Sequence, residues 1–348
     1  MPSGVREVPI QRSAKLTHLT LVETQNEWND ICVRFADAEF TQSYEWGEAR
    51  RLQGWEPRRF VLKDATTSIA AAQMLVKSYF GFRVVYCARG PIWQRRDKTP
   101  AECVDVLAAM LDAVVEAHPF SAVVCDLHCD RALLPDSSLE TRGFRRIRAG
   151  VTADIDLHAD LVVRRASFHR KWRNDLKKAE QASLKICRYA PPDHLDELYA
   201  LAGSTAARKG FVVGVNHVVA ERFLTLRPSG TSMILAAVNP DGTAAASALI
   251  VWFNLTGSYL VGASVSKHDP AFSRGASNLV QWEALRSVKA TGCTTYNLEG
   301  LDLEKNPGVF RFKQRMNGRL RLTSGMWIRT PHNLVTAVLR MLLKRLRP

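Results

Sequence analysis

The sequence lacks the long apolar runs, the regularly spaced cysteines and the leader signal that mark several large classes of protein. No uninterrupted apolar stretch among the 348 residues approaches the ~18 needed for a membrane-spanning helix. The seven cysteines show no framework spacing, which argues against a disulfide scaffold and favours a reducing compartment. Residues 1–15 contain no apolar core of a secretory signal. We therefore expect a loose leader and a cytoplasmic protein.

Several motifs that carry common chemistry are also missing. The chain has no G-x-S-x-G elbow, no Walker loop and no G-x-G-x-x-G, which argues against hydrolase, NTPase and dinucleotide-binding functions. The segment Cys125–Asp130 contains two cysteines, a histidine and two aspartates, all suitable metal ligands. However, no second Cys/His pair with zinc spacing occurs, and Cys125 belongs to an apolar strand. We therefore predict no metal.

Acidic residues are few beside the basic ones. Lys and Arg total 48 against 34 Asp and Glu, a net charge of +14. The hydrophobic share of 46% and the charged share of 24% are ordinary for a globular protein, and the length suits two domains. The excess of positive charge predicts a polyanionic partner, such as nucleic acid, a phosphorylated substrate or an anionic membrane surface.

The two halves of the chain show the same order of predicted elements: a hairpin, a third strand, a helix and a central strand. In the first half these are expected over 58–63, 69–77, 84–88, 99–117 and 122–125, and in the second over 233–238, 244–253, 258–265, 273–291 and 294–298. Both second strands are rich in alanine. We interpret the pattern as a duplicated α/β unit with a boundary near 155–165, although a hairpin followed by a helix also recurs by chance.

Three further elements are expected near the ends of the two halves. A strand is expected over 16–22, followed by a helix that opens at Thr24, and a segment over 40–54 ends at Gly54. A last strand is expected over 319–328.

A basic segment, 164–188, carries nine Lys and Arg against Asp175 and Glu180. Within it, 170–179 is expected to be helical, so that Arg170, Arg173 and Lys177 share one face. Such a face suits a phosphate backbone, because bound phosphates release counterions. A solvated surface helix is the plainer alternative, and the global charge favours the polyanion.

A second segment, 310–321, combines five Lys and Arg with Phe310 and Phe312. A lysine held between aromatic rings could stabilise a developing oxyanion, since its charge acts more strongly where water is excluded. Composition alone favours a simpler alternative, an amphipathic helix with extended basic side chains. Asp126, at the expected end of a central strand, is a candidate for a substrate contact.

The C-terminal residues 332–348 form a basic amphipathic pattern of leucines with Lys and Arg. Such a helix could lie on an anionic membrane or pack its leucines onto the second domain, and the sequence favours neither.

Six segments, taken in order, resemble the FemABX family of peptidoglycan aminoacyltransferases. They cover roughly residues 40–325, and Gly-x-x-x-Phe-Lys near the end is the most specific piece. The segments are Gln42–Arg50 with Gly54–Pro57, Tyr86–Pro91, Arg170–Ala179, Ala207–Gly210, Tyr296–Gly300 and Gly308–Lys313.

This resemblance implies an α/β (α+β) fold of two tandem GNAT-like N-acyltransferase domains, with mixed central sheets flanked by helices. We expect a leader over 1–15, domains over 16–158 and 159–330, and the basic helix over 331–348. It also implies an aminoacyl-tRNA as co-substrate without a further cofactor. The acceptor would be the stem-peptide amine of a peptidoglycan precursor, carried on lipid II or on a nucleotide. No long coiled-coil insertion is apparent, so the chain is similar to the armless members, and 332–348 could contact the inner membrane face.

The resemblance also implies roles for individual residues. Lys313 would stabilise the transition state, with Phe312 beside it. The precursor would contact Arg50, Trp46, Asp126, Arg208, Tyr259 and Tyr296. The tRNA would contact Arg170, Lys171, Arg173, Lys177 and Lys178.

Two other functions compete with this prediction. One is a GNAT-type N-acyltransferase that uses acyl-CoA in polysaccharide modification, which would need a glycine-rich phosphate loop at a helix start. The corresponding segment, 272–277, has one glycine, which counts against CoA. The other is a non-catalytic, basic binder of RNA or membrane surfaces.

Overall fold

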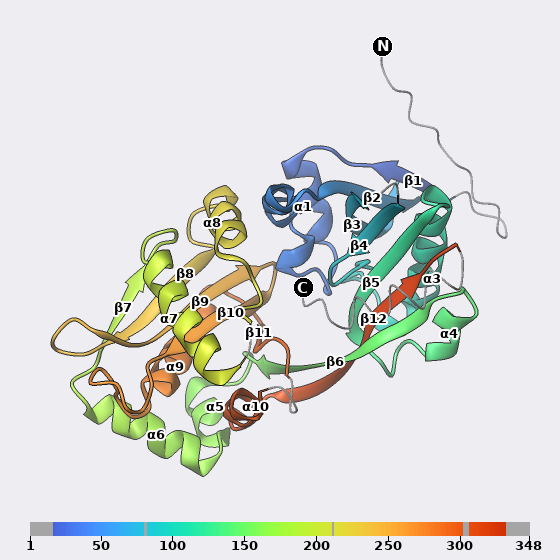
Figure 1. Cartoon of the computed structure of the whole chain (residues 1–348). Coiled ribbons are helices and arrows are strands. Elements are labelled where there is room, and N and C mark those ends of the chain that lie inside the picture. Colours follow the sequence, from blue (N-terminus) through green and yellow to red (C-terminus); the bar gives the residue numbers. More distant parts are fainter. Residues whose placement is uncertain (1–16, 80–81, 211, 302–305, 332–348) are drawn as a thin grey trace. The chain divides into compact units, whose positions relative to one another are not determined.

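The computed structural model describes residues 17–79, 82–210, 212–301 and 306–331 (Figure 1). The leader predicted over 1–15 lies outside these residues, as does the basic helix predicted over 332–348. The described chain divides into two compact units: unit 1 runs to Gly150 and resumes at Leu322, and unit 2 comprises Val151–Arg321. The domain limits suggested by the sequence, 16–158 and 159–330, stay a prediction about separately folding domains.

Unit 1 contains one mixed sheet with helices around it. Its strands follow the order β1-β2-β3-β4-β5-β12, in which β4 and β5 are parallel and the other neighbours antiparallel. The strands are β1 (Thr17–Leu21), β2 (Glu56–Asp64), β3 (Thr67–Tyr79), β4 (Phe82–Cys87), β5 (Ser121–Asp130) and β12 (Arg319–Arg329). The helices are α1 (Gln25–Cys32), η1 (Phe40–Gln42), α2 (Tyr44–Arg50), η2 (Arg51–Gln53), α3 (Pro100–Ala117) and α4 (Asp136–Glu140).

Unit 2 repeats this arrangement. Its strands follow the order β7-β8-β9-β10-β11-β6, and β10 and β11 are its parallel pair. The strands are β6 (Arg145–Asp156), β7 (Lys185–Tyr189), β8 (Ser232–Val238), β9 (Ala244–Phe253), β10 (Thr256–Ser264) and β11 (Thr295–Asn297). The helices are α5 (Leu161–Ser167), α6 (Arg170–Gln181), α7 (Leu195–Lys209), α8 (His217–Leu226), α9 (Ala276–Ala290) and α10 (Pro307–Gln314).

The repeated order that the sequence indicated is present in both units. Each has an antiparallel hairpin, a third strand antiparallel to it, a helix and a fourth strand parallel to the third. The repeat is longer than the sequence suggested, because a strand and two helices precede each hairpin. Sequence reasoning missed β7, α7 and α8 of unit 2, and it also missed β6.

Two strands, β6 and β12, run through the boundary between the units. β6 begins in unit 1, and its second half pairs with β11, whereas β12 begins in unit 2, and its second half pairs with β5. Within unit 1 the two strands approach closely: a Cβ on Gly325, whose φ is +81°, would lie 2.3 Å from the carbonyl oxygen of Arg148. Only glycine fits there. Each unit thus receives its last strand from the segment that follows the other unit's repeat.

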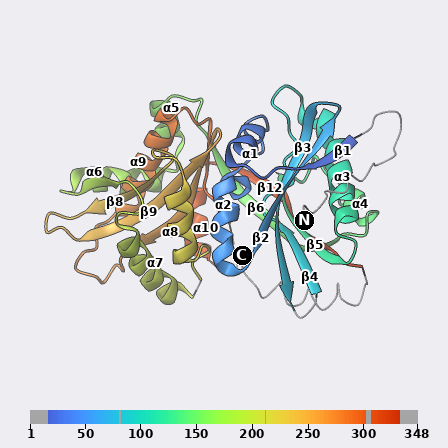
Figure 2. The same cartoon turned by 90° about the horizontal axis from the view of Figure 1, so that it is seen from above.

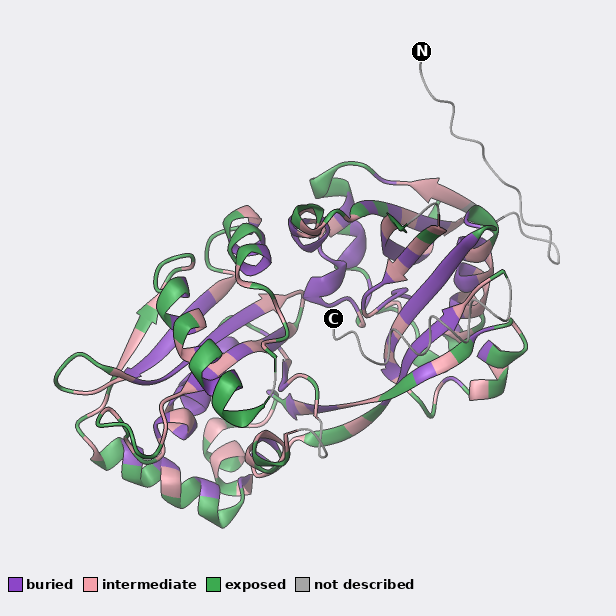
Figure 3. Ribbon diagram, in the orientation of Figure 1, coloured by how far each residue is buried: buried purple, intermediate pink, exposed green. Residues whose placement is uncertain are grey.

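Each unit has its own apolar core, visible as the buried strands in Figure 3. In unit 1, α3 begins with a Thr99–Glu102 capping box and Pro100 at its first position, and it packs Leu107, Met110 and Val114 onto the sheet. All seven cysteines are unpaired, as their irregular spacing predicted.

Candidate active site

Lys313 is buried on the inner side of α10. Asn306 caps this helix by accepting a hydrogen bond from the backbone N–H of Val309 at 3.2 Å, and Pro307 occupies the first turn. The lysine is 6% exposed, and its Nζ donates to the carbonyl oxygen of Gly300 at 3.2 Å. Nζ also lies 5.5 Å from the centre of the Tyr259 ring. The cation is therefore held in place where little water screens it.

Tyr259 lies in β10 beneath this ammonium group. A bulge between Tyr259 and Val261 breaks the pairing with β9, and the phenol folds back over Gly262. A Cβ on Gly262 would lie 1.5 Å from the phenolic oxygen, so any larger residue here would displace the Tyr259 ring. Burial raises the pKa of Tyr259 to about 12, so the hydroxyl stays protonated and can donate a hydrogen bond at neutral pH.

Tyr296 supports this group from within the core. It is fully buried in β11, and its hydroxyl donates to Oε1 of Gln281 on α9 at 3.0 Å. Burial raises its pKa well above the ordinary value, and the nearby Tyr259 adds to the effect. Tyr296 thus lies behind Tyr259 and away from the surface, so a role in substrate binding would act through its neighbours.

Phe312 lines a cavity of about 320 Å³ on unit 2. Its ring centre is 6.3 Å from that of Trp172, a buried residue of α6. Trp172 Nε1–H is a buried donor that has no hydrogen-bond partner among the described residues. The cavity is lined by Lys171, Trp172, Asp175, Asn278, Gly308, Arg311, Phe312 and Arg315.

A larger cavity of about 640 Å³ runs along α6, which supplies most of its lining residues. Lys171 and Asp175 line both cavities, so the two adjoin. The larger cavity is strongly basic, with five Lys and Arg against one carboxylate, Asp175, which pairs with Arg274 at 3.1 Å. It is lined by His169, Arg170, Lys171, Asn174, Asp175, Lys177, Lys178, Gln181 and Arg274.

The basic helix predicted over 170–179 is thus present as α6, with its N-cap at His169. Four of the five residues predicted to contact tRNA line the larger cavity. Arg173 is exposed on the same helix but does not line it.

The predicted precursor residues of unit 1 gather around α2 and β5. Ser43 caps α2 by accepting from the backbone N–H of Trp46 at 3.3 Å. The Arg50 guanidinium lies 5.7 Å from the centre of the buried Trp46 ring. Burial lowers the pKa of Arg50, and burial raises that of Tyr86, on which Asp126 and Arg50 also act. Arg50, Tyr86 and Asp126 therefore form one electrostatic group.

The expectation that Asp126 ends its strand is wrong. β5 continues to Asp130, because β12 pairs with it and places Met326 opposite Asp126. Asp126, His128 and Asp130 alternate with buried apolar residues, so they share the more open face of the strand.

The same face holds a cluster that sequence reasoning missed. The Glu39 carboxylate accepts a hydrogen bond from Arg89 Nη1 at 2.5 Å and also bonds Nδ1 of His128. Arg89 acts on Tyr86 as well, so this cluster adjoins the Arg50 group. The alternation of Asp126, His128 and Asp130 was the one signal available, whereas the partner Glu39 is remote in sequence. Within the described ranges, no group of three or more His, Cys, Asp and Glu could hold a metal ion.

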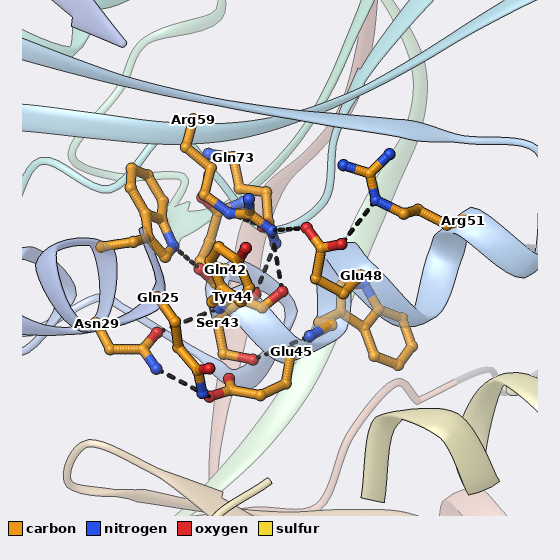
Figure 4. Close-up of polar contacts among 12 residues, drawn as sticks. Gln25, Asn29, Gln42, Ser43, Tyr44, Glu45, Glu48, Arg51, Arg59 and Gln73 are labelled. Carbon is orange, nitrogen blue, oxygen red and sulfur yellow. Dashed lines mark hydrogen bonds and ion pairs between the residues drawn. The ribbon is translucent and has the colours of Figure 1, made fainter. Parts of the chain in front are cut away.

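A buried polar network fixes α2 to the sheet of unit 1 (Figure 4). Arg59 donates from Nε to Gln73 at 2.8 Å and from Nη2 to Glu48 at 2.9 Å. Gln42 accepts from the backbone N–H of Gln73 at 2.8 Å. Since Glu48 belongs to α2 while Arg59 and Gln73 belong to β2 and β3, these bonds hold the helix that carries Trp46 and Arg50.

Arg208 lies apart from the Lys313 group. Its Nη2 donates to the carbonyl oxygen of Ser264 at 3.0 Å, and Thr205 donates to the same oxygen at 2.9 Å. Ser264 ends β10, roughly 15 Å along the strand from Tyr259. Unit 2 therefore brings together Lys313, Tyr259 and Tyr296, with Phe312 on the adjoining helix face, and leaves Arg208 elsewhere.

The duplicated α/β unit is the tandem GNAT-like fold that the sequence predicted. Comparison with protein-family models matches the FemAB family over residues 24–128 and 224–344. The chain belongs to the FemAB family, as the ordered motifs suggested, and it is an aminoacyltransferase of peptidoglycan synthesis. A comparison with curated protein sequences finds no match.

Three solved structures share the fold at low sequence identity. FemX aligns over 92% of this chain and 99% of its own, with a TM-score of 0.77 and 16% identity. L-PGS from Bacillus licheniformis aligns over 93% and 97%, with a TM-score of 0.57 and 16% identity. A tandem GNAT protein from the clavulanic acid pathway aligns over 91% and 99%, with a TM-score of 0.52 and 11% identity. These matches confirm the predicted fold class.

The family also favours the enzymatic prediction over a non-catalytic binder. Among the residues that the structure describes, no helix combines the length and apolar character needed to cross a bilayer.

Proposed function

We propose that this enzyme moves an aminoacyl group from aminoacyl-tRNA to the stem-peptide amine of a peptidoglycan precursor carried on lipid II or on a nucleotide. The observation that carries the proposal is the buried Lys313 ammonium on α10, the helix that also places Phe312 in the wall of a cavity adjoining the strongly basic one. An ester donor with a polyanionic carrier fits this combination of an oxyanion-stabilising group and a phosphate-binding surface.

The chemistry follows from the position of the charge. The neutral acceptor amine attacks the ester carbonyl, the new C–N bond forms, and the C–O bond to the ribose breaks. The amine loses a proton, and the leaving ribose oxygen gains one. Lys313 stabilises the oxyanion in between, a role typically worth ~2.7–4 kcal/mol per donor. The Gly300 carbonyl and the Tyr259 ring hold the ammonium in advance, so little reorganisation is needed.

The two adjoining cavities support a seat for the donor's 3′ end. Phosphates suit the larger cavity, because Arg170, Lys177 and Lys178 of α6 all line it. The terminal base suits the smaller one, where it could stack on Phe312. The scheme needs no additional cofactor.

We assign binding of the acceptor to the predicted precursor residues of unit 1, Arg50, Trp46 and Asp126. Asp126 would attract the acceptor ammonium before it loses its proton, and Arg50 would contact a precursor phosphate, with Trp46 holding the guanidinium in place. Tyr259, the predicted precursor residue of unit 2, would donate a hydrogen bond from its hydroxyl, which stays protonated. Arg208 and Tyr296, predicted for the same substrate, lie outside this scheme as direct contacts, by position and by burial respectively. Contact of residues 332–348 with a membrane stays a prediction.

Acyl-CoA is disfavoured as donor by the start of α9. A Cβ on Gly275 would lie 2.0 Å from the carbonyl oxygen of Asp175, and Asn278 donates to the carbonyl of Trp172 at 3.3 Å. α6 therefore covers the helix start at which a CoA pyrophosphate would have to bind. Thermal-shift measurements separate the donors: we expect stabilisation by charged tRNA, whereas stabilisation by acetyl-CoA alone would favour the alternative.

Lys313→Ala tests the mechanism. We expect single-turnover transfer from labelled aminoacyl-tRNA to fall by about 10²–10³-fold, because one oxyanion donor is lost. The affinity for charged tRNA should change little, since the phosphates bind α6. Lys185→Ala, an exposed lysine at the start of β7, is the matched control. Near-normal turnover of Lys313→Ala would remove this residue from the mechanism.

A further inference from the structure

One end of the unit 1 sheet, where strands start and stop, exposes apolar side chains beside cations. β2, β4 and β5 begin at this end, and β3 finishes there. Phe120, directly before β5, is 84% exposed, Tyr79 at the end of β3 is 44% exposed, and Leu52 before β2 is 56% exposed. We call these three residues, with Arg58, Lys77 and Arg83, the rim. Large apolar side chains gathered in this way usually mark an interaction surface.

The rim projects because β3 and β4 extend beyond the ends of the neighbouring strands β2 and β5. β3 pairs with β2 only as far as Val76, opposite Glu56, and β4 pairs with β5 only from Arg83, opposite Ser121. Lys77–Tyr79 therefore extend three residues past β2, roughly 10 Å. The β3 and β4 ribbons run side by side to this end of the sheet (Figure 2). Tyr79 thus lies on a projection of the molecule.

The rim carries positive charge that its own acids do not cancel. Glu56 pairs with Arg58 at 2.5 Å. Lys77 instead donates to the backbone oxygen of Gln53 at 2.6 Å, and its ammonium lies 5.1 Å from the Tyr79 ring centre. Arg83 is exposed and has no carboxylate partner among the described residues. Lys77 and Arg83 therefore leave the rim cationic.

A cavity of about 440 Å³ opens between these cations. Arg58, Lys77 and Arg83 line it together with His118, whose pKa is lowered by burial and further by both arginines. The volume is within the range of small-ligand sites. Glu56 also lines the cavity and pairs with Arg58, so the charges left for a phosphate are the held Lys77 ammonium and the Arg83 guanidinium.

We propose that the rim rests on an anionic lipid bilayer, with Phe120, Tyr79 and Leu52 at the level of the headgroups and lipid phosphates at Lys77 and Arg83. Aromatic side chains beside Lys and Arg are the residues that proteins place at membrane–water interfaces. The projection matches the 5–10 Å to which interfacial segments enter a bilayer.

The arrangement favours a membrane over a nucleic acid. Single strands bind in grooves that follow the backbone, whereas these apolar groups stand on a projecting edge. Leu52 offers no stacking face, and Phe120 is too exposed to form one wall of a groove. The proposal uses residues other than 332–348, and it does not depend on the donor or acceptor proposed above.

The experiment measures partitioning of the full chain onto vesicles of phosphatidylcholine, alone or mixed in equal parts with phosphatidylglycerol. We expect binding to the anionic vesicles only. Phe120→Ser should weaken binding to the vesicles about tenfold, because the membrane no longer buries a phenylalanine side chain. Tyr79→Ser should weaken it in the same direction. Arg83→Gln should weaken it about fivefold, the typical contribution of one cation near an anionic surface.

Two exposed residues of unit 1 serve as matched controls: Val33→Ser, at a side chain 47% exposed, and Lys98→Gln. Their binding should stay within about twofold of wild type, as for other surface substitutions. Every variant retains residues 332–348, so any contribution of that segment cancels. Unchanged melting temperatures would show that all variants fold.

The proposal is overturned if Phe120→Ser and Tyr79→Ser bind anionic vesicles as wild type does, or if the controls lose as much. It is also overturned if only Arg83→Gln matters, which would indicate a purely electrostatic surface. A short RNA that binds in place of vesicles and loses affinity in Phe120→Ser would assign the rim to nucleic acid. A polarity-sensitive dye on Phe120→Cys should shift to the blue on anionic vesicles, whereas the same dye on Val33→Cys should not.

Discussion

The two units share one order of strands and helices, yet the helix that follows the third strand begins differently in each unit. In unit 1, α3 caps itself: Glu102 accepts from the Thr99 hydroxyl at 2.6 Å and from its backbone N–H at 2.7 Å. In unit 2, α9 starts at Gly275 without a side-chain cap and packs against α6. The same scaffold therefore has a self-contained helix in one unit and a covered one in the other.

The difference shows how a repeated fold can acquire distinct surfaces. α5 and α6 precede β7 in unit 2, and the described part of unit 1 has no counterpart before β1. This added pair of helices covers the usual phosphate position of the scaffold and presents a basic cavity instead. Unit 1 instead buries a polar network, in which Arg59, Gln73 and Gln42 hold α2. The two units thus differ in their surfaces through attached elements and side chains, while the order of their strands is the same.

Gly275→Ala would break the covered helix start. The new Cβ meets a backbone oxygen at 2.0 Å and also adopts a φ of +84°, so we expect a loss of about 3 kcal/mol or more in unfolding free energy. Transfer activity should fall with it as α6 shifts. Gly292→Ala is the control, because Gly292 has a φ of +85° but open space around it. Equal losses in the two variants, measured by urea unfolding, would show that contact with α6 is unimportant.

Lys177→Gln combined with Lys178→Gln would sharpen the contrast in surface charge. If both side chains neutralise RNA phosphates, the slope of log affinity against log salt concentration should fall by about 2, and charged tRNA should bind about tenfold more weakly. Filter binding over a series of salt concentrations measures both. Lys98→Gln in unit 1 should leave the slope unchanged, and an unchanged slope in the double variant would move the donor site away from α6.

Glu102→Ala would test the self-capped helix of unit 1 with the smallest effect. Bonds from Thr99, first from its hydroxyl and then from its backbone N–H, lower the pKa of Glu102. A lowered folded-state pKa means that the contribution is full above the ordinary glutamate value and is lost as pH falls through the lowered value. The difference in stability between wild type and variant should therefore shrink towards acid. Urea unfolding over a series of pH values measures the difference, and one that does not change with pH would exclude the cap.

Local patterns predicted the elements whose signals lie within a few residues. Thr99 and Pro100 marked the start of α3, Gly54 marked the end of the 40–54 segment at a φ of +76°, and the Asn239–Gly242 turn joined β8 to β9. The family motifs likewise led to the family and to the basic helix. Missed were β6 and β7, whose pairing depends on remote strands.

The residues of the candidate site also fall into two groups, those that the sequence pointed to and those that only the structure revealed. The family resemblance singled out Lys313 and Phe312, whereas composition alone favoured a simple amphipathic helix. Neither gave a sign that Tyr259 folds over Gly262, because the bulge arises in the pairing with β9. The Glu39–His128 contact joins residues remote in sequence, and no local pattern links them.

By itself, the sequence determined the charge, the repeated order of elements and the family, because composition, periodicity and short motifs are properties of neighbouring residues. The tertiary structure alone decided that β6 and β12 cross between the units and that Asp126 lies within a strand. It also decided that Lys313 is buried against Tyr259 and Gly300. The physical reason is that pairing and burial are set by groups distant along the chain, whose proximity exists only once both sheets have formed.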